Sequence, residues 1–578
     1  MVLLDPERRT TLVGVMLMAC AGLATAEPLA LYVSPGGNDT WSGRRAEIAA
    51  PDGPFATLAR ARDELRALRG AQGLPEGAVV NVLPGLYELR ETLTLGPEDS
   101  GTEQAPIVYR GAGDEKPILT GGRALTGWRE LEDGIVWCDL KANELAGKPI
   151  SVFVFGGALQ TLARYPNFDP NDPHQGAWAY VASVEGSENR AEFRYGEDET
   201  HAWEHPEDAA VHIHPYFDWA WNIVKLKAHD PATRTLTLAD KVSYALHIGD
   251  RYFLDNLFEE LDAPGEWYRD PRTEAFYFKP PRPIDEAAPV AAALDDIVVM
   301  EGAQHITLRG LVLECCNGTP VRINNSQHCA VVGSIVRNCG GWGVSISGGE
   351  YSGARGNDVY DCGHGGISVT GGSRDTLEPG RLFADNNYVH HCARVWKTYR
   401  PGISVNGVGN TVSHNLIHDM PHAALLLGGN DNVVELNHVR HCNLESADTG
   451  GIYFCSRDWT QRGNVIRHNL FHHCGGFGKA NSWAPLQGGK VTFEYPHFTW
   501  GIYLDDPTTG TLVYGNIVYA APICGLHNHG GRDNVWENNI VVDAPAFNAG
   551  MLSPDWSEWP PIKDRLHKYQ QPGSPYLT

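Results

Sequence analysis

Three aspartates in the last third of the chain have the type and spacing to cleave a glycosidic bond. Asp458 follows a glycine-led strand motif, and Asp505 and Asp506 end the equivalent motif one repeat later. Glycoside hydrolysis needs two carboxyl groups that flank the bond, one of them acting as general acid. We therefore predict that Asp458 and one of Asp505 and Asp506 form the catalytic pair. Adjacent positions favour a short, retaining-type separation, but the longer corner at Asp458 leaves the inverting range open.

Polar and aromatic side chains surround these aspartates in the same repeats and could bind a sugar. Histidine can orient a carboxylate or contact a hydroxyl group, and an aromatic ring can pack flat against a sugar ring. We expect substrate contacts from Asp448, Tyr453, Trp459, Tyr503, His527 and His529. Each acid also has an ordinary structural explanation: Asp506-Pro507 is typical of a turn, and Arg457 with Asp458 of a surface ion pair.

A recurring unit in the second half of the chain must position these residues. Each copy begins with asparagine or a small residue, continues with a β-prone pair and ends with cysteine, alanine or methionine. The first residues of successive copies are at least 22 residues apart. Short strands at a fixed minimum spacing, with loops of variable length between them, are typical of a solenoid. We predict an all-β, right-handed parallel β-helix, with an internal asparagine ladder formed by Asn357, Asn387, Asn415, Asn437, Asn469, Asn516 and Asn539.

Six cysteines recur at the end of this unit: Cys315, Cys339, Cys362, Cys392, Cys442 and Cys474. Stacked coils would bury them as a column of small apolar side chains. Metal binding and a thiol redox chain are the functional alternatives, but there is no C-x-x-C pair and no cluster with zinc-ligand spacing. We expect a scaffold role, no metal and no cofactor.

Glycine-led strands precede each asparagine and give a register for the outer face. Alternation along a strand places the residue two after the glycine outward. Tyr453, Tyr503 and His527 then share one outer column, and Asp505 and His529 the next. The predicted site thus lies on adjacent coils near the C-terminal end of the helix.

The remainder of the chain divides into segments of different character. The sequence 57–69 has apolar residues on one face and predicts a helix that caps the open end of the first coils. The tryptophans of the middle region, Trp178, Trp203, Trp219, Trp221 and Trp267, are expected mostly in a core, with one or two facing substrate. The expected segments are 1–26 signal peptide, 27–128 N-terminal cap and first coils, 129–290 inserted β-rich module, 291–553 main β-helix with the site, and 554–578 a C-terminal tail without a clear capping element.

The N-terminus is typical of an export signal. Arg8 and Arg9 precede a short apolar run, and Ala24-Thr25-Ala26 resembles a cleavage site. The run also resembles a lipobox, with Cys20 as the acylated residue. We expect a secreted or periplasmic protein or, alternatively, a lipid anchor at the cell envelope, without a membrane span.

The charge of the chain narrows the choice of partner. A net charge of −24 argues against a nucleic acid, which would require a basic face. The acids and aromatic residues of the site instead indicate an oligosaccharide or polysaccharide substrate for a protein that acts as a monomer.

Several motifs resemble a known family. Asp448-Thr449-Gly450-Gly451-Ile452-Tyr453, Arg457-Asp458-Trp459-Thr460, Gly501–Asp506 and His529–Asn534 are similar to segments of glycoside hydrolase family 141. That family is a β-helix group with fucosidase and xylanase members and a pair of catalytic aspartates. The resemblance implies Asp458 and one of Asp505 or Asp506 as the pair. The segment 479–499, before the second acid, departs from the pattern.

Two other functions compete with hydrolysis. A polysaccharide lyase acting on a uronate would need a base, often lysine or arginine, and a cation to neutralise the substrate carboxylate. The predicted coils contain only Arg457 and Arg532 as obvious cations. A non-catalytic glycan-binding surface protein would explain the solenoid but not the concentration of acids and histidines on a few coils.

Overall fold

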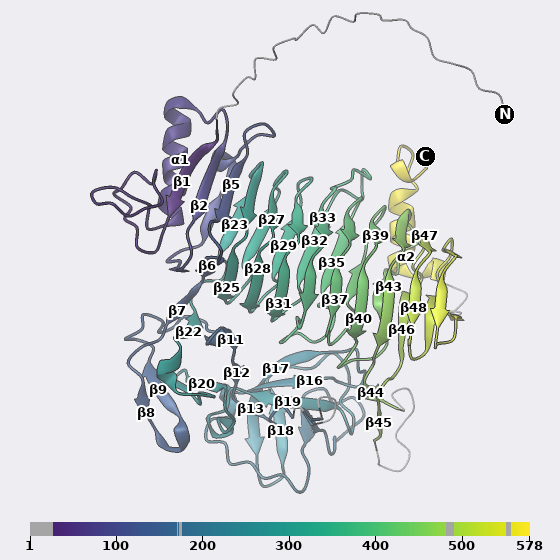
Figure 1. Ribbon diagram of the computed structural model, residues 1–578. Helices are drawn as coiled ribbons and strands as arrows, with labels where there is room; N and C mark the ends of the chain where they lie inside the picture. The colour runs from purple at the N-terminus through teal and green to yellow at the C-terminus, as the bar shows by residue number, and fades with distance from the viewer. Residues whose placement is uncertain (1–26, 170, 173–175, 481–490, 551–555, 578) are drawn as a thin grey trace, which may run out of the picture.

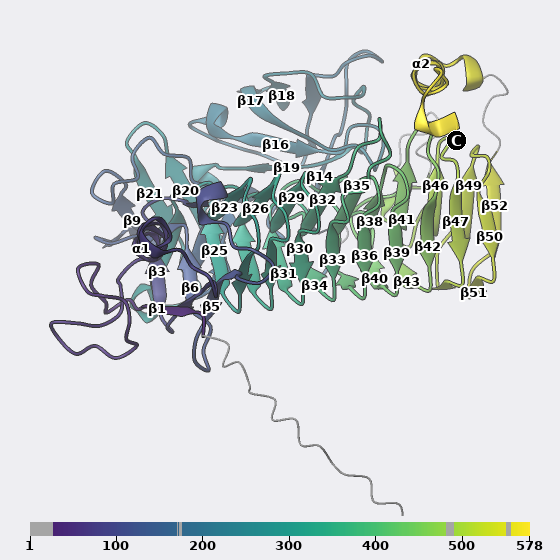
Figure 2. The ribbon, with the colours of Figure 1, turned by 90° about the horizontal axis from the view of Figure 1, so that it is seen from above.

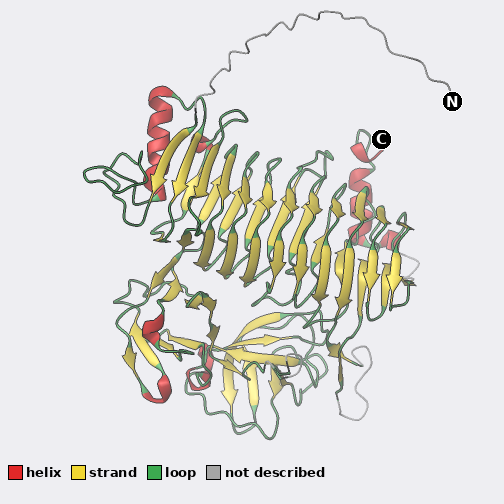
Figure 3. Cartoon of the chain, in the orientation of Figure 1, coloured by secondary structure: helices red, strands yellow, loops and turns green. Residues whose placement is uncertain are grey.

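The computed structural model describes residues 27–169, 171–172, 176–480, 491–550 and 556–577. The expected signal peptide and Cys20 lie outside these ranges. Strands dominate the described chain, and the two α-helices lie near its two ends (Figure 3). No helix within the described ranges is long and apolar enough to cross a membrane.

Three long parallel sheets wind into a right-handed β-helix, as predicted (Figure 1). One sheet runs from β1 (Leu29–Val33) to β50 (Val535–Glu537), and a second from β3 (Leu86–Glu88) to β51 (Ile540–Val542). The third sheet carries the candidate site. Its order is β4 (Leu93–Leu95), β23 (Val298–Glu301), β26 (Val321–Asn324), β29 (Val344–Ser347), β32 (Ile367–Gly371), β35 (Ile403–Gly407), β38 (Leu425–Leu427), β41 (Thr449–Cys455), β46 (Thr499–Asp505), β49 (Cys524–His529) and β52 (Phe547–Gly550).

One continuous apolar core fills the solenoid because every strand turns alternate side chains inward. In β41 and β46 the paired Ile452 and Ile502 are buried in this core, while the paired Tyr453 and Tyr503 point to the other face. A shift of one residue would exchange these faces, so the core fixes the register of the site.

The predicted asparagine ladder is present. The amide nitrogen of Asn387 donates to the side-chain oxygen of Asn415 at 2.9 Å, and Asn415 donates in the same way to Asn437 at 2.9 Å. A second ladder at another corner includes Asn410, whose backbone N–H donates to the side-chain oxygen of Asn432. These buried amides satisfy backbone groups where the coils turn and no strand partner is available.

The cysteine column is also present, with one change at its start. Cys316, rather than Cys315, is in register with Cys339, which in turn pairs with Cys362. Cys315 has a positive φ of 57° and turns its thiol toward Val290 outside the helix. All described cysteines are free thiols, and all except Cys455 are buried.

An inserted module leaves the solenoid after β6 (Ile118–Thr120) and returns before β23. It starts with β7 (Gly122–Ala124) and ends with β22 (Pro289–Ala292). Its strands form three small, mostly antiparallel sheets around separate apolar cores. Two views place the module alongside the coils (Figures 1 and 2), so it covers one side of the helix.

A helix lies near each end of the described chain. The predicted cap is α1 (Leu58–Gln72), and the Thr57 side chain accepts from the Arg60 N–H at its N-terminus. Leu58, Ala61 and Leu65 pack into the end of the solenoid core. Near the other end of the chain, α2 (Pro560–Tyr569) lies along the side of the coils (Figure 1), where Arg565 contacts Asp458 and Lys568 contacts Asp375. It does not cover the final strands, where Ile540 and Phe547 are exposed.

Candidate active site

Strands β41, β46 and β49 place the predicted columns side by side. Tyr453 pairs with Tyr503, and Tyr503 with His527. In the next outward position, Cys455 pairs with Asp505. Residues of consecutive parallel strands lie about 5 Å apart, so these polar groups meet on one surface.

This surface forms one end of a cavity of about 860 Å³ between the coils and the inserted module. Such a volume is at the upper end of the range for small-molecule sites and is large enough for several sugar rings. Seven of the nine residues named from the sequence line it: Asp448, Tyr453, Tyr503, Asp505, Asp506, His527 and His529.

Asp505 is the most fully hydrogen-bonded acid of the cavity. Its Oδ2 accepts from the Tyr453 hydroxyl at 2.6 Å, and its Oδ1 accepts from the Asp506 N–H at 2.7 Å. Nδ1 of His529 also lies 2.7 Å from Oδ1. Burial raises the pKa of Asp505, but bonds from His529, Tyr453 and Tyr503 outweigh it, and the net pKa is below the usual range. Asp505 is therefore ionised at neutral pH.

Asp448 lies across the cavity in a left-handed turn immediately before β41, with φ of 55°. Burial and then the negative charge of Asp505 raise the pKa of Asp448 to about 7. The Tyr503 hydroxyl donates to its Oδ1 at 3.3 Å. The pKa values of Asp448 and Asp505 thus depart from the ordinary value in opposite directions. The sequence placed Asp448 among the substrate contacts, because its burial cannot be read from local pattern.

Asp506 is adjacent but differently held. Its backbone is in the left-handed region with φ of 43°. The Arg457 guanidinium donates to its Oδ2, and the Cys455 thiol lies 3.4 Å from the same oxygen. The ion pair directs the Asp506 carboxylate toward the loop that connects β41 to the next strand.

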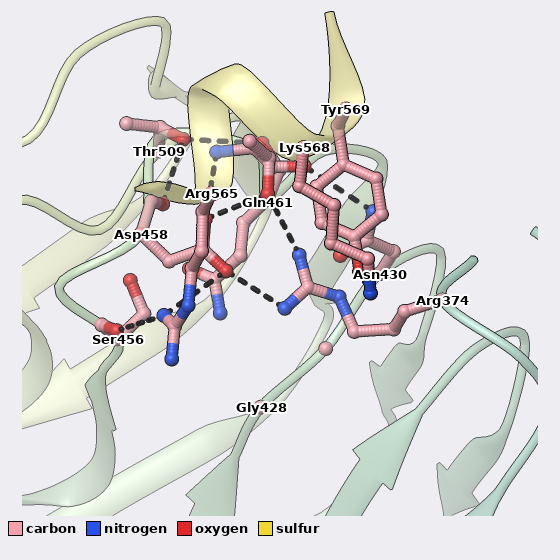
Figure 4. Close-up of polar contacts among 12 residues, drawn as sticks. Arg374, Gly428, Asn430, Ser456, Asp458, Gln461, Thr509, Arg565, Lys568 and Tyr569 are labelled. Carbon is pink, nitrogen blue, oxygen red and sulfur yellow. Dashed lines mark hydrogen bonds and ion pairs between the residues drawn. The ribbon is translucent and has the colours of Figure 1, made fainter. Parts of the chain in front are cut away.

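The structure does not bring Asp458 into the cavity. Its side chain is 0 % exposed, and its Oδ2 lies 2.7 Å from Arg374 and 3.2 Å from Arg565 of α2 (Figure 4). The Thr460 hydroxyl and N–H donate to its Oδ1. Burial raises the pKa of Asp458, but these partners outweigh it and lower the net pKa. With every oxygen engaged, Asp458 joins the C-terminal helix to the coils.

Trp459 is also absent from the cavity lining. The Arg532 guanidinium packs over its ring at 4.5 Å from the centroid. This cation–π contact occupies the face that a sugar would need. The sequence could not predict either position, since Arg374, Arg532 and Arg565 come from distant segments.

The two histidines of the site have different environments. The hydrogen bond to Asp505 raises the pKa of His529, so His529 donates from Nδ1 as a cation over a wider pH range. Burial lowers the pKa of His527, whose ring stacks on Trp500 at 4.8 Å. His529 orients Asp505, whereas His527 extends an aromatic floor.

Aromatic residues that the sequence did not assign complete the cavity. Tyr399, Phe498 and Trp500 come from loops and strand starts of the coils, and Trp219 and Tyr244 from the module. Trp219 is one of five module tryptophans expected to be mostly core, and the other four are indeed buried. Phe217 and Trp219 are separated by a single residue, and this aromatic pair is the sequence feature that could have indicated a role at the cavity.

Two groups of side chains within the described ranges have a geometry that could hold a metal ion. One is Cys455 with Asp505 and Asp506; the other is His391 with His418 and Asp419 on a different sheet. In the first group Arg457 and His529 already neutralise the two carboxylates. A cation there would have to displace both partners.

Comparisons with known proteins agree with the fold. The family model described as "Right handed beta helix region" matches residues 296–379 and 380–541. A solved structure titled "Glycoside hydrolase" aligns over 88 % of this chain and 96 % of that chain, with 17 % identity and a TM-score of 0.67. At that identity the similarity shows the architecture.

Other solved structures align more loosely. "The complex structure of XylC with xylose" has 12 % identity and a TM-score of 0.43, covering 89 % of this chain and 86 % of that chain. A pectate lyase, Pel9A, has 10 % identity and a TM-score of 0.36, covering 91 % of this chain and 78 % of that chain. A search of curated proteins finds no match. The family model and the first of these structures show that the chain has the right-handed parallel β-helix fold.

Proposed function

We propose that this protein is a glycoside hydrolase in which Asp448 donates a proton to the leaving group and Asp505 attacks or activates water. The observation that carries the proposal is the opposite perturbation of two carboxyl groups in one cavity. The pKa of Asp448 is raised to about 7, and that of Asp505 is lowered below its usual range. Glycoside hydrolysis requires one acid of each kind.

The electrostatic coupling of the two acids favours a retaining mechanism, because the negative charge of nearby Asp505 helps to raise the pKa of Asp448. Retaining enzymes hold their carboxyl groups about 5–5.5 Å apart, whereas inverting enzymes leave room for a water molecule. In this scheme Asp505 forms a covalent glycosyl intermediate. Asp448 first protonates the leaving oxygen and then deprotonates the incoming water.

The remaining predicted residues have supporting roles in this proposal. Tyr453 and His529 orient the Asp505 carboxylate and stabilise its charge. Arg457 with Asp506 forms the adjacent wall of the cavity and contacts sugar hydroxyl groups. Asp448 takes the place of Asp458 in the predicted catalytic pair, and Asp505 is the member of the Asp505/Asp506 alternative that this proposal selects.

The charges of the cavity favour a neutral glycan over a uronate. Three carboxyl groups line the cavity, and the cations among its described lining residues, Arg457 and His529, are both paired with them. A uronate carboxylate would meet repulsion, and no unpaired lysine or arginine of this described lining could act as the base of a lyase. A binding-only protein would not need two acids with opposed pKa shifts.

We also propose export through segment 1–26, with either cleavage after Ala26 or acylation at Cys20. N-terminal sequencing of the mature protein distinguishes a start at Glu27 from a blocked start at Cys20. The predicted monomer is checked by sedimentation of the same material.

Incubation with a panel of glycans tests the function. The panel contains neutral polysaccharides, uronate-containing polysaccharides, and 4-nitrophenyl glycosides that include a fucoside and a xyloside. We expect new reducing ends or nitrophenol with neutral substrates, and loss of turnover in D505N. Ultraviolet absorbance from an unsaturated uronate would replace hydrolysis with lyase chemistry, and binding without turnover would leave a glycan-binding protein.

A further inference from the structure

The inserted module contributes an aromatic wall to the cavity. Trp219 lies in the loop between β16 (Ala210–Ile213) and β17 (Asn222–Asp230), and Tyr244 in the loop between β18 (Thr235–Leu238) and β19 (Arg251–Asp255). Both loops reach from the module to the coils that carry the acids. The site is therefore built from two parts of the chain with separate cores.

The rings of this wall are held in fixed orientations. Phe217 stacks on one face of Trp219 at 5.1 Å with an interplanar angle of 15°. Tyr244 meets both rings edge-on, at 5.2 Å from Trp219 and 4.9 Å from Phe217. Trp219 remains half-buried, and both Trp219 and Tyr244 line the cavity. A preorganised flat apolar surface of this kind suits the apolar face of a sugar ring.

Hydrogen bonds of buried charged side chains connect the loop that carries Trp219 to the coils. Asp218, next to Trp219, accepts from Arg251 at 3.1 Å and from the Lys479 N–H at 2.8 Å. Arg251 also donates to the backbone oxygen of Glu445, three residues before Asp448. Buried ion pairs contribute little net stability but fix one geometry. Arg251 thereby joins the module to the segment of the coils that leads into the proposed acid Asp448.

A chain of ring contacts spans the distance from this wall to the reacting groups. Trp219 lies 6.5 Å from Tyr399, and Tyr399 lies 6.2 Å from Tyr453, whose hydroxyl bonds Asp505. The Tyr399 ring thus lies between Trp219 and the tyrosine that holds Asp505. A ligand that contacts both Trp219 and the reacting groups extends past Tyr399.

We propose that Trp219 and Tyr244 form a separate subsite that stacks a neutral sugar ring on the leaving-group side of the cleaved bond. The inference rests on the proposed function, because the acid Asp448 defines which side holds the leaving group. The module then selects substrates by the sugar on the far side of the cleaved bond, and it makes the protein prefer an oligosaccharide to a substrate with a small leaving group.

Kinetics on paired substrates test this subsite. One substrate is a glycosyl fluoride of the sugar whose anomeric carbon reacts, so that fluoride replaces the leaving-group sugar. The other is the matching oligosaccharide, which has a sugar ring on the leaving-group side of the cleaved bond. We expect W219A and Y244A to lower the ratio of kcat/KM for oligosaccharide to that for fluoride by about tenfold, as for an aromatic anchor in an interface. W219F should restore part of the ratio. An unaltered ratio in both alanine variants overturns the subsite and leaves the proposed hydrolase intact.

Controls separate folding and turnover from stacking. Tyr277, in the same module, packs against Phe258 at 5.0 Å away from the cavity, so Y277A should not change the ratio. Affinity electrophoresis in gels that contain soluble arabinoxylan or xyloglucan measures binding without catalysis. We expect D505N to be retarded and D505N/W219A to lose the retardation. If D505N and D505N/W219A are retarded equally, the subsite is overturned. The same holds if D505N is not retarded in either gel, and both results can be obtained even if no substrate is turned over.

Discussion

The role of Asp448 as proton donor gives a quantitative prediction for D448N. At pH 6 a carboxyl group with a pKa of about 7 is about 90 % protonated, whereas one near the ordinary value of 3.9 is less than about 1 % protonated. Burial and the charge of Asp505 therefore enrich the working form about a hundredfold. Removal of a general acid costs about 10²–10⁴ in rate, equivalent to about 3–5 kcal/mol.

The loss of rate in D448N should depend on how strongly the leaving group needs a proton in order to depart. We expect D448N to lose this factor in kcat/KM with oligosaccharides and to retain most of kcat/KM with 2,4-dinitrophenyl glycosides, whose leaving group departs without protonation in the first step. The wild-type rate should fall above about pH 7 as Asp448 ionises, and this alkaline limb should disappear in D448N with the activated substrate. An equal loss on all leaving groups, or an alkaline limb that survives in D448N, would falsify the assignment.

Four further outcomes are expected. D505G should be inactive, and added azide should restore turnover and give a glycosyl azide of opposite anomeric configuration, detected by NMR; no azide product would contradict a covalent intermediate. D448N should raise the melting temperature at pH 8 and hardly at pH 4, since a carboxyl with a raised folded pKa loses stability as pH rises between its unfolded and folded values. D458N should lower the melting temperature, because two arginines lose a fully buried partner at a cost of about 3–5 kcal/mol, while turnover per folded molecule persists. N415A should cost roughly 3 kcal/mol or more in thermal unfolding because it leaves several buried ladder groups unpaired, whereas N406A on the exposed face should have little effect.

The fold was predictable because its determinants repeat. Each coil uses the same buried asparagine and the same alternation of inward and outward residues, so local pattern implies the stacking of Asn387 on Asn415. The same alternation implies that Tyr453, Tyr503 and His527 share one outer column, as the strand pairing confirms. The positions of these residues are set only by pairing with the neighbouring coils.

The parts that pattern did not reveal depend on contacts between distant segments. Asp458 is buried by Arg374 and by Arg565 of the C-terminal helix, and neither arginine belongs to its coil. The raised pKa of Asp448 comes from its burial and from the charge of Asp505. The pKa and the exposure of these side chains therefore depend on contacts that only the folded chain makes.

The position of the inserted module has a consequence for how the chain folds. Val312 of β25 (Val312–Cys316) pairs directly with Ile118 of β6, although the whole module separates them in sequence. Closing a flexible loop of that length would cost roughly 5 kcal/mol in chain entropy beyond a constant. Inside the module, however, Val290 pairs with Ala124, which holds the two ends together. A module that folds before these coils stack removes most of this entropy cost, so the coils on its two sides can pair as if they were close in sequence.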